Sequence, residues 1–216
     1  MIRVALVDLG MGNLHSVERA LAQGATDAGI ECTVERTSDA DAVRRADKIV
    51  VPGQGAFRDC AAGLSREAGG MGDALRERIG AGVPFLGICL GLQALFEGSD
   101  EAPGAAGLGI FAGRVERLGS GEGYKIPHMG WNRITLRVQT PGRGPLAVFA
   151  GEAPYFYFVH SFHAVPIDPT LIAAVTEHGP HRVTAAVQRD NVTATQFHPE
   201  KSQAAGLRLL AAFLRG

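Results

Sequence analysis

The sequence has no apolar run long enough to cross a membrane. A helical span needs ~18 or more apolar residues in succession, and no segment of this chain approaches that length. Residues 1–8 form a short strand-like segment that is unlike a secretion signal. We therefore expect a cytoplasmic protein that does not enter the membrane.

The chain also has almost no net charge and few cysteines. With 21 basic and 22 acidic side chains the net charge is −1, so electrostatics favours neither nucleic acid nor an anionic membrane as a partner. The three cysteines, Cys32, Cys60 and Cys89, are odd in number and lack the spacing of a metal site. We expect no disulfide, no metal and, because no cofactor motif is present, no cofactor.

What is present is an ordinary globular composition. The chain has 216 residues, 46% of them apolar, which suits one domain over residues 1–216. Strand-like and helix-like segments alternate in the first half, which predicts an α/β fold with a doubly wound parallel sheet. The predicted strands are residues 2–7, 32–35, 48–51 and the run that ends at Cys89, and the predicted helices are residues 14–25, 39–46 and 71–79.

The second half is rich in strand-like segments separated by glycine-rich and proline-rich turns. Little helical pattern intervenes, so we expect an antiparallel layer joined to the parallel sheet. Ser202 is a suitable N-cap for a final helix. The predicted strands are residues 108–118, 133–138, 155–165, 171–176, 183–189 and 192–197.

Cys89 lies between two glycines at the end of an apolar run. Gly87 and Gly91 have the spacing of a nucleophile elbow, in which a strand turns sharply into a helix, here over residues 90–96. A side chain at either glycine would crowd the strand and helix that cross there. The helix N-terminus favours a thiolate, so Cys89 is a candidate nucleophile. The alternative is a small core residue, since cysteine is among the most buried residue types.

A histidine and a glutamate follow the last predicted strand. In an extended segment residues i and i+2 point the same way, so Glu200 can hold the His198 ring from behind while the other ring nitrogen faces a thiol. Cys89, His198 and Glu200 then match the nucleophile, base and orienting acid of a triad. The alternative, a strand-end histidine beside a solvated glutamate, describes a purely structural role. Such a role is the better interpretation for the other histidines, which are His15, His128, His160, His163, His178 and His181.

Three motifs together resemble the class I glutamine amidotransferases. They are Gly-Ile-Cys-Leu-Gly at residues 87–91, Pro-Gly-Gln-Gly at residues 52–55 and Phe-His-Pro-Glu at residues 197–200. The resemblance implies the flavodoxin-like fold of that family and hydrolysis of the side-chain amide of glutamine. Cys89 would attack the amide, His198 would protonate the departing ammonia, and water would release glutamate from a thioester.

The tetrahedral intermediate of this reaction needs an oxyanion hole. Its natural donors are the backbone N–H of Leu90 and the loop of Gly53, Gln54 and Gly55, which follows another parallel strand. The two glycines leave the intervening peptides free to rotate. The loop is therefore a candidate switch, because an inward carbonyl would repel the oxyanion and a flipped peptide would stabilise it. The alternative is an ordinary turn.

The family pattern also implies contacts with the substrate. Gln93, one helical turn after Cys89, and Glu101 would hold the glutamine. The backbone of Ser161 and Phe162 would bind its amino-acid end.

Three further segments resemble the glutaminase subunits of imidazole glycerol phosphate synthases, from histidine biosynthesis. They are residues 10–13, 128–132 and 155–161, although Met11 stands where that family often has proline. The resemblance implies a heterodimer in which a (β/α)8 cyclase receives the ammonia, with weak glutaminase activity until the cyclase binds its own substrate. The implied docking residues are Asn13, Trp131, Tyr157 and Lys201.

Other interpretations stay open at this point. The chain could serve another synthase, such as those for pyridoxal phosphate, anthranilate or aminodeoxychorismate. It could be a thiol peptidase or γ-glutamyl hydrolase on the same fold, or a binding module whose cysteine senses oxidation. Trp131 and Tyr157 could also be core aromatics.

Overall fold

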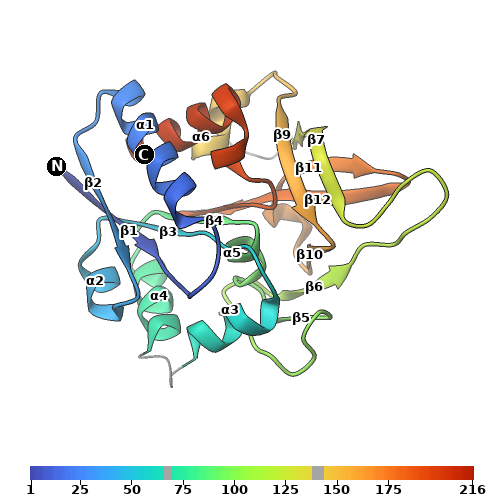
Figure 1. The fold of residues 1–216 in the computed structure, drawn as a ribbon, viewed down its shortest axis with the longest axis horizontal. Coiled ribbons are helices and arrows are strands. Elements are labelled where there is room, and N and C mark those ends of the chain that lie inside the picture. Colours follow the sequence, from blue (N-terminus) through green and yellow to red (C-terminus); the bar gives the residue numbers. More distant parts are fainter. Residues whose placement is uncertain (66–69, 138–143) are drawn as a thin grey trace.

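The central strands of the first half are buried on both faces, as a doubly wound sheet requires. Every residue of β3 (Lys48–Val51) and β4 (Phe85–Ile88) is buried, and helices lie on both sides of their sheet (Figure 1). This computed structural model describes residues 1–65, 70–137 and 144–216. It confirms the predicted α/β class with a largely parallel sheet.

The central sheet changes from parallel to antiparallel along its width. In spatial order its strands are β2 (Cys32–Thr37), β1 (Ile2–Val7), β3, β4, β13 (Val192–Thr195), β12 (His181–Arg189), β11 (Ile172–His178) and β8 (Thr135–Leu136). Neighbours from β2 to β13 pair in parallel, and those from β13 to β8 pair antiparallel. The antiparallel strands therefore extend the same sheet.

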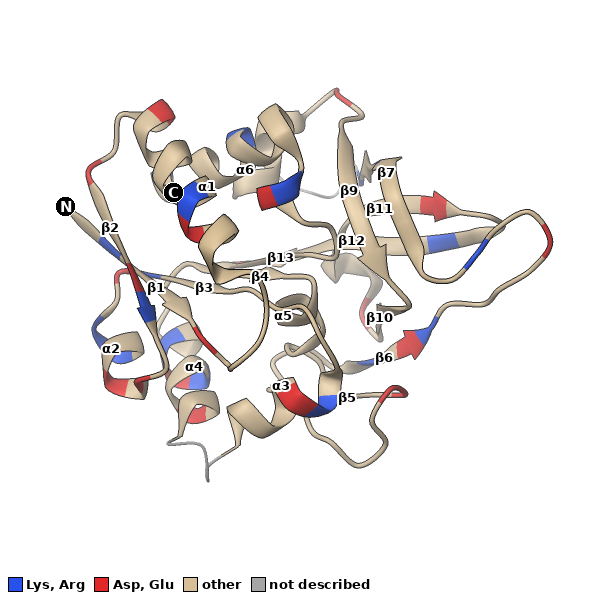
Figure 2. Ribbon diagram, viewed as in Figure 1, with Lys and Arg blue, Asp and Glu red and all other residues tan. Residues whose placement is uncertain are grey.

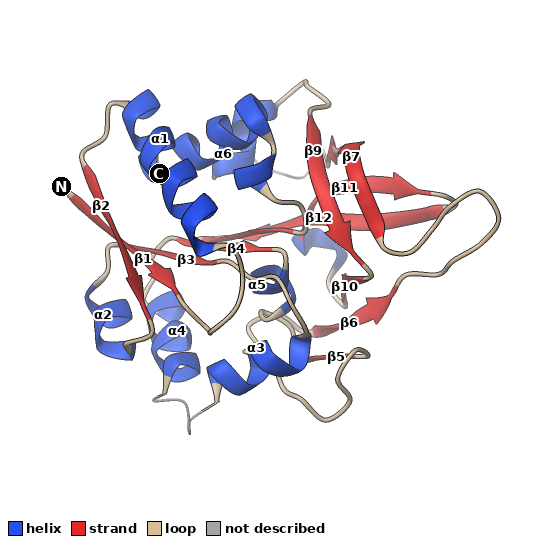
Figure 3. Cartoon of the chain, viewed as in Figure 1, coloured by secondary structure: helices blue, strands red, loops and turns tan. Residues whose placement is uncertain are grey.

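Helices cover both faces of this sheet (Figures 1 and 3). On one face lie α1 (Leu14–Ala28) and α6 (Gln203–Arg215), and on the other lie α2 (Ala40–Arg45), α3 (Phe57–Leu64) and α4 (Met71–Gly80). The short helices are α5 (Leu90–Gln93), η2 (Pro145–Phe149), η3 (Pro169–Leu171) and η4 (Pro199–Lys201). Among the described residues, no helix combines the length and the apolar character of a membrane span.

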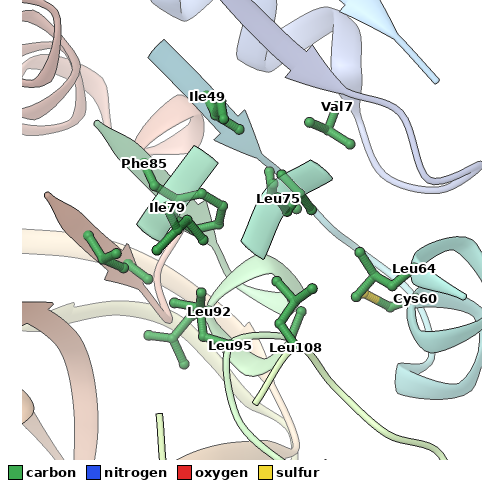
Figure 4. Close-up of a cluster of buried hydrophobic side chains, with 14 of the residues drawn as sticks. Val7, Ile49, Cys60, Leu64, Leu75, Ile79, Phe85, Leu92, Leu95 and Leu108 are labelled. Atoms are coloured by element: carbon green, nitrogen blue, oxygen red, sulfur yellow. The ribbon is translucent and has the colours of Figure 1, made fainter. Parts of the chain in front are cut away.

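Alternate residues of the central strands contribute to two hydrophobic cores. Ile49 and Val51 belong to the core beneath α2, α3 and α4, whereas Val50 belongs to the core beneath α1 and α6. Figure 4 shows part of the first core, with Leu75 of α4 beside the strands. The continuous apolar runs of these strands are thus explained by burial on both sides.

Two small sheets lie toward the antiparallel end of the central sheet (Figure 3). One pairs β7 (His128–Arg133) with β9 (Tyr155–His160). The other joins β10 (Phe162–Pro166), β6 (Gly113–Arg117) and β5 (Gly98–Ser99). Together with the extended sheet they account for the strand-rich second half.

Several predicted strands of the second half are shorter or more divided than the sequence pattern indicates, whereas β11 and β12 are slightly longer. Residues 155–165 form β9 and β10 in different sheets, because the chain changes its pairing partner at Ser161. Residues 133–138 hold the end of β7 and the short β8, while Val138 lies outside the described residues. Of residues 108–118, only the part that forms β6 is a strand.

Two predicted helix ends also need correction. Ser202 precedes α6 but does not cap it. Its hydroxyl donates to the carbonyl of His198 at 2.6 Å and accepts from the N–H of Tyr157 at 3.0 Å, so it joins the start of α6 to β9. The helix expected over residues 90–96 ends at Gln93, because the next N–H groups include bonds to the third residue back, as in a tighter turn.

Charged side chains of both signs are interspersed over the ribbon (Figure 2). Several pair at the surface, such as Arg208 with Glu152 at 2.8 Å and Arg44 with Glu77 at 3.0 Å. These side chains are partly exposed, so each pair contributes at most about 1 kcal/mol. The stability of the fold therefore depends mainly on the two cores.

Truncation of Leu75 tests that dependence. Leu75 is fully buried in the core of Figure 4, so Leu75→Ala should lower the free energy of unfolding by about 2–5 kcal/mol. Denaturant titration measures this change. The matched control is Ile167→Ala, because Ile167 is 75% exposed and its truncation should cost less than about 0.5 kcal/mol. Equal losses in the two variants would contradict the assignment of this core.

Candidate active site

Cys89 lies at the tip of a strained turn between β4 and α5. Its φ of 54° and ψ of −101° fall in a region that residues with side chains rarely adopt. A Cβ at Gly91 would lie 1.9 Å from the carbonyl oxygen of Val51, and one at Gly87 would lie 2.6 Å from that of Gly91. Only glycine fits at these two positions, so the close crossing of strand and helix fixes the turn that presents Cys89.

His198 and Glu200 lie together just beyond β13. Nδ1 of His198 is 2.8 Å from Oε1 of Glu200, and both side chains are almost completely buried. A carboxylate can only accept, so Nδ1 carries a proton, and Nε2 is the ring nitrogen that is not bound to Glu200. The N–H of His198 also donates to the carbonyl of Tyr157 at 2.9 Å, which fixes the backbone.

The environment of His198 favours its charged form. Burial acts against the imidazolium, but interactions with Cys89 and Glu200 outweigh it and raise the pKa of His198 to about 9. Near neutral pH the ring is therefore protonated. The three residues that the sequence motifs single out form one cluster, in which the imidazolium interacts with the sulfur of Cys89 and with the carboxylate of Glu200.

The loop after β3 meets the turn that contains Cys89. The N–H of Leu90 donates to the carbonyl of Gly53 at 3.5 Å, a long bond. The carbonyl of Gly53 is therefore turned toward the donor expected to serve the oxyanion hole. Gly55 has a φ of 133°, which favours glycine, and a Cβ there would lie 3.8 Å from the sulfur of Met11. Nε2 of Gln54 is buried without a hydrogen-bond partner among the described residues.

A pocket of about 400 Å³ opens beside Cys89. This volume is within the range of small-molecule sites. Among the described residues, Gly53, His198 and Glu200 are not part of its lining, whereas most of the other residues singled out for catalysis or glutamine binding are. The pocket is lined in part by Gln54, Gly55, Cys89, Leu90, Gln93, Glu101, Ser161, Phe162 and Lys201.

Gln93 is held by the protein through its amide nitrogen. Nε2 donates to the carbonyl of Phe162 at 3.0 Å and to Oε1 of Gln196 at 3.2 Å. Both N–H bonds are thus used, which leaves the carbonyl oxygen of Gln93 for a ligand in the pocket. Nε2 of Gln196 in turn donates to the sulfur of Cys89 at 3.5 Å.

Gln196 is the contact that sequence reasoning missed. It lies directly before the Phe-His-Pro-Glu motif, and its side chain is fully buried. A long amide side chain within the predicted buried strand 192–197 is a signal that could have indicated it, because a buried amide needs partners.

Glu101 approaches the pocket from a different side. Its Oε2 accepts the N–H of Phe57 at 2.9 Å, at the N-terminus of α3. The positive end of the helix suits a carboxylate there. One oxygen of Glu101 is therefore bound to the helix, while the other is left for a ligand.

The residues implied in partner docking lie in three different settings, which are the β7–β9 ribbon, the start of α1 and, for Lys201, the pocket wall. Trp131 is 48% exposed and packs edge to face on Tyr157, with ring centroids 6.2 Å apart, so Trp131 is not a core aromatic. Met129 and Tyr155 on the same β7–β9 ribbon are also exposed. Asn13 is exposed and caps α1 by accepting an N–H of its first turn.

No three His, Cys, Asp or Glu side chains in residues 1–65, 70–137 and 144–216 converge in a way that could hold a metal ion.

Comparison with known proteins identifies the family. The family model for class-I glutamine amidotransferases matches residues 6–215. The chain belongs to this family. One relative, the imidazole glycerol phosphate synthase subunit HisH of Methylococcus capsulatus, is 49% identical, with 100% of this chain and 97% of the relative covered. The subunit of the same name from Thermosynechococcus vestitus is 47% identical, with 98% and 95% covered.

Solved structures agree with this amidotransferase fold. A crystal structure described as a glutamine amidotransferase matches with a TM-score of 0.70 and 20% identity, covering 98% of this chain and 97% of that one. The PurLQS structure from Thermotoga maritima matches with a TM-score of 0.71 and 18% identity, covering 100% and 98%. At these identities the likeness concerns the fold alone.

The turn of this amidotransferase can be tested by filling its closest contact. Gly91→Ala places a Cβ against the Val51 carbonyl, which cannot move without disturbing β3. The variant should lose at least about 3 kcal/mol of unfolding free energy. Gly80→Ala is the control, because a Cβ there would meet nothing within 4 Å at the end of α4. Equal stability of wild type and Gly91→Ala would refute the close crossing.

The raised pKa of His198 predicts how stability depends on pH. The folded pKa of about 9 exceeds the unfolded value of about 6.5, so the stabilisation is complete below pH ~6.5 and is lost as the pH rises through ~9. We expect the difference in unfolding free energy between wild type and His198→Gln to fall by on the order of 3 kcal/mol across that window. Denaturant titrations over this pH range measure it, and a difference that grows with pH would contradict the protonated assignment.

Proposed function

We propose that this chain is the glutaminase subunit of an imidazole glycerol phosphate synthase and acts in histidine biosynthesis. Relatives of nearly full-length coverage that carry this subunit name support the proposal. The observation that carries it is the cluster of Cys89, His198 and Glu200 beside a pocket of suitable size for an amino acid. The substrate is glutamine, and the products are glutamate and ammonia.

The triad divides the hydrolysis into two steps. The thiolate of Cys89 attacks the side-chain amide carbon of glutamine, and His198 gives its proton to the nitrogen as the C–N bond breaks and ammonia leaves. Water then attacks the thioester and gives a proton to His198, after which the C–S bond breaks, glutamate leaves and the sulfur is ready again. Glu200 holds the ring in the required tautomer, in keeping with its 2.8 Å contact.

The oxyanion hole is formed by Leu90 and by the loop of Gly53, Gln54 and Gly55. In the arrangement described above, the carbonyl of Gly53 accepts the N–H of Leu90, so it would repel a developing oxyanion. Rotation of the peptide after Gly53 replaces that carbonyl with an N–H donor and frees the Leu90 donor. This loop is thus the gate of the reaction.

Glutamine binds with its amino-acid end among Gln93, Glu101, Ser161 and Phe162. The free oxygens of Gln93 and Glu101 are acceptors, which suits the ammonium group of an amino acid. The backbone of Ser161 and Phe162, also in the pocket lining, supplies the remaining contacts. Lys201 lies at the same pocket.

The partner is the (β/α)8 cyclase, which docks on a surface that includes Asn13, Trp131, Tyr157 and Lys201. Exposed aromatic side chains on the β7–β9 ribbon support this choice, because aromatic residues are common anchors of interfaces. The cyclase uses the ammonia to make imidazole glycerol phosphate and an aminoimidazole carboxamide ribonucleotide. The complex is a heterodimer.

A glutaminase assay with and without the partner tests the proposal. Glutamate release should rise by at least about 100-fold when the cyclase and its nucleotide substrate are added, since loss of an oxyanion donor costs that much. Cys89→Ala should abolish the activity in both conditions. Cys32→Ala, which removes a partly buried thiol on β2, should behave as wild type.

Two outcomes would sink the proposal. Equal hydrolysis with and without the cyclase would contradict both the gating role of the loop and the choice of the cyclase as partner. Activity that survives in Cys89→Ala would contradict the assignment of Cys89 as the nucleophile.

A further inference from the structure

Two buried histidines face each other across the β7–β9 ribbon. His128 and His160 are directly paired in the strand register, and both are almost fully buried. Nδ1 of His128 is 3.0 Å from Nε2 of His160. A contact between two ring nitrogens at this distance is a hydrogen bond only if one of them carries a proton and the other does not.

At the outer end of this pair, Asn132 determines which ring nitrogen of His128 carries the proton. Its Nδ2 donates to the carbonyl of Glu177 at 2.7 Å, and its Oδ1 accepts the N–H of Arg133 at 2.8 Å, which fixes the orientation of the amide. The same Nδ2 is 3.1 Å from Nε2 of His128. Nε2 of His128 must therefore accept, and the proton of that ring is on Nδ1.

At the inner end, the carbonyl of Phe162 independently determines which ring nitrogen of His160 carries the proton. Nδ1 of His160 is 2.9 Å from the carbonyl oxygen of Phe162, which can only accept. The proton of His160 is therefore on Nδ1, and its Nε2 accepts from His128. The two ends of the chain require the same direction of donation.

Both rings are neutral in this arrangement. Burial, assisted by neighbouring histidines, lowers the pKa of His128 to about 4 and that of His160 to about 3. His128 is also stacked on Phe158, with centroids 4.7 Å apart, and on His178, with centroids 4.3 Å apart. The pair is thus rigid and uncharged at neutral pH.

The inner end of the chain reaches the candidate active site. The carbonyl of Phe162 accepts from His160 and also from Nε2 of Gln93. Gln93 lines the pocket and donates to Gln196, which donates to the sulfur of Cys89. The position of one carbonyl group therefore decides how the amide of Gln93 is presented.

We propose that Asn132, His128 and His160 form a hydrogen-bond relay with one fixed proton direction, which positions the carbonyl of Phe162 and so orients Gln93 for glutamine. This inference rests on the proposed function of the pocket. His128 and His160 are positioning residues that act through Phe162 and Gln93, and His160 also forms part of the pocket wall. The relay begins on β7 next to Trp131, so it joins the exposed aromatic surface to the substrate pocket.

Nitrogen NMR of the wild-type protein tests the proton direction without any activity. Two-bond ¹H–¹⁵N spectra of histidine-labelled protein distinguish the two neutral tautomers and the charged ring. At neutral pH both His128 and His160 should be neutral with the proton on Nδ1. A proton on Nε2 of either ring, or a charged ring, would overturn the relay, and this result holds even if the proposed function fails.

Steady-state kinetics of the complete complex test the positioning role. His160→Leu removes the donor to Phe162 and should raise KM for glutamine by about tenfold, with kcat changed less than about threefold. His160→Asn keeps an N–H donor near the position of Nδ1 and should restore most of the loss. His163→Asn is the matched control, because His163 is the neighbouring half-buried histidine and its Nδ1 has no partner among the described residues.

The comparison of variants separates the two proposals. Equal KM values for His160→Leu and His160→Asn, or a loss in kcat alone, would overturn the relay while an active wild type leaves the proposed function intact. A wild-type complex without glutaminase activity would contradict the proposed function. The NMR spectra would then remain the test of the relay.

Discussion

The close approach of α5 to the end of β3 is the constraint on which the site depends. Position 91 lies so near the carbonyl of Val51 that a single methyl group would overlap it. Two structures must meet at that crossing: the turn that presents Cys89 and the loop that continues from β3. The N–H of Leu90 consequently lies against Gly53. The nucleophile and the loop opposite it are parts of one packed unit, whose geometry is held by the parallel sheet.

β9 connects the rest of the site to the surface of the molecule. Its backbone at Tyr157 holds both His198 and Ser202, while its side chains pack against the exposed Trp131. At the end of the strand His160 turns inward to the pocket. A displacement of this ribbon therefore acts on the imidazole and on the pocket wall together, because both are hydrogen-bonded to the same strand.

Local sequence patterns made the fold class and the core of the site predictable. The strand pairing and the contacts between distant residues could not be predicted in this way. The glycines around Cys89 are a short-range pattern with a steric reason, so they can be recognised in the sequence. The extended segment expected from His198 to Glu200 is wrong, because residues 199–201 form the 3-10 helix η4, and this turn brings the two side chains together. The break at Ser161 cannot be recognised in the sequence, because strand propensity does not say which strand pairs with which. The roles of Gln196 and of the buried histidines depend on partners that only the folded chain brings together.

The length of the bond between Leu90 and Gly53 also has an energetic meaning. At 3.5 Å it is near the limit of hydrogen bonding, so the closed loop is held by little more than its own packing. A partner that favours the rotated loop by about 1.4 kcal/mol would already change its population tenfold. Under the proposed function, a threshold of this size would let the binding of an ammonia acceptor raise glutamine hydrolysis.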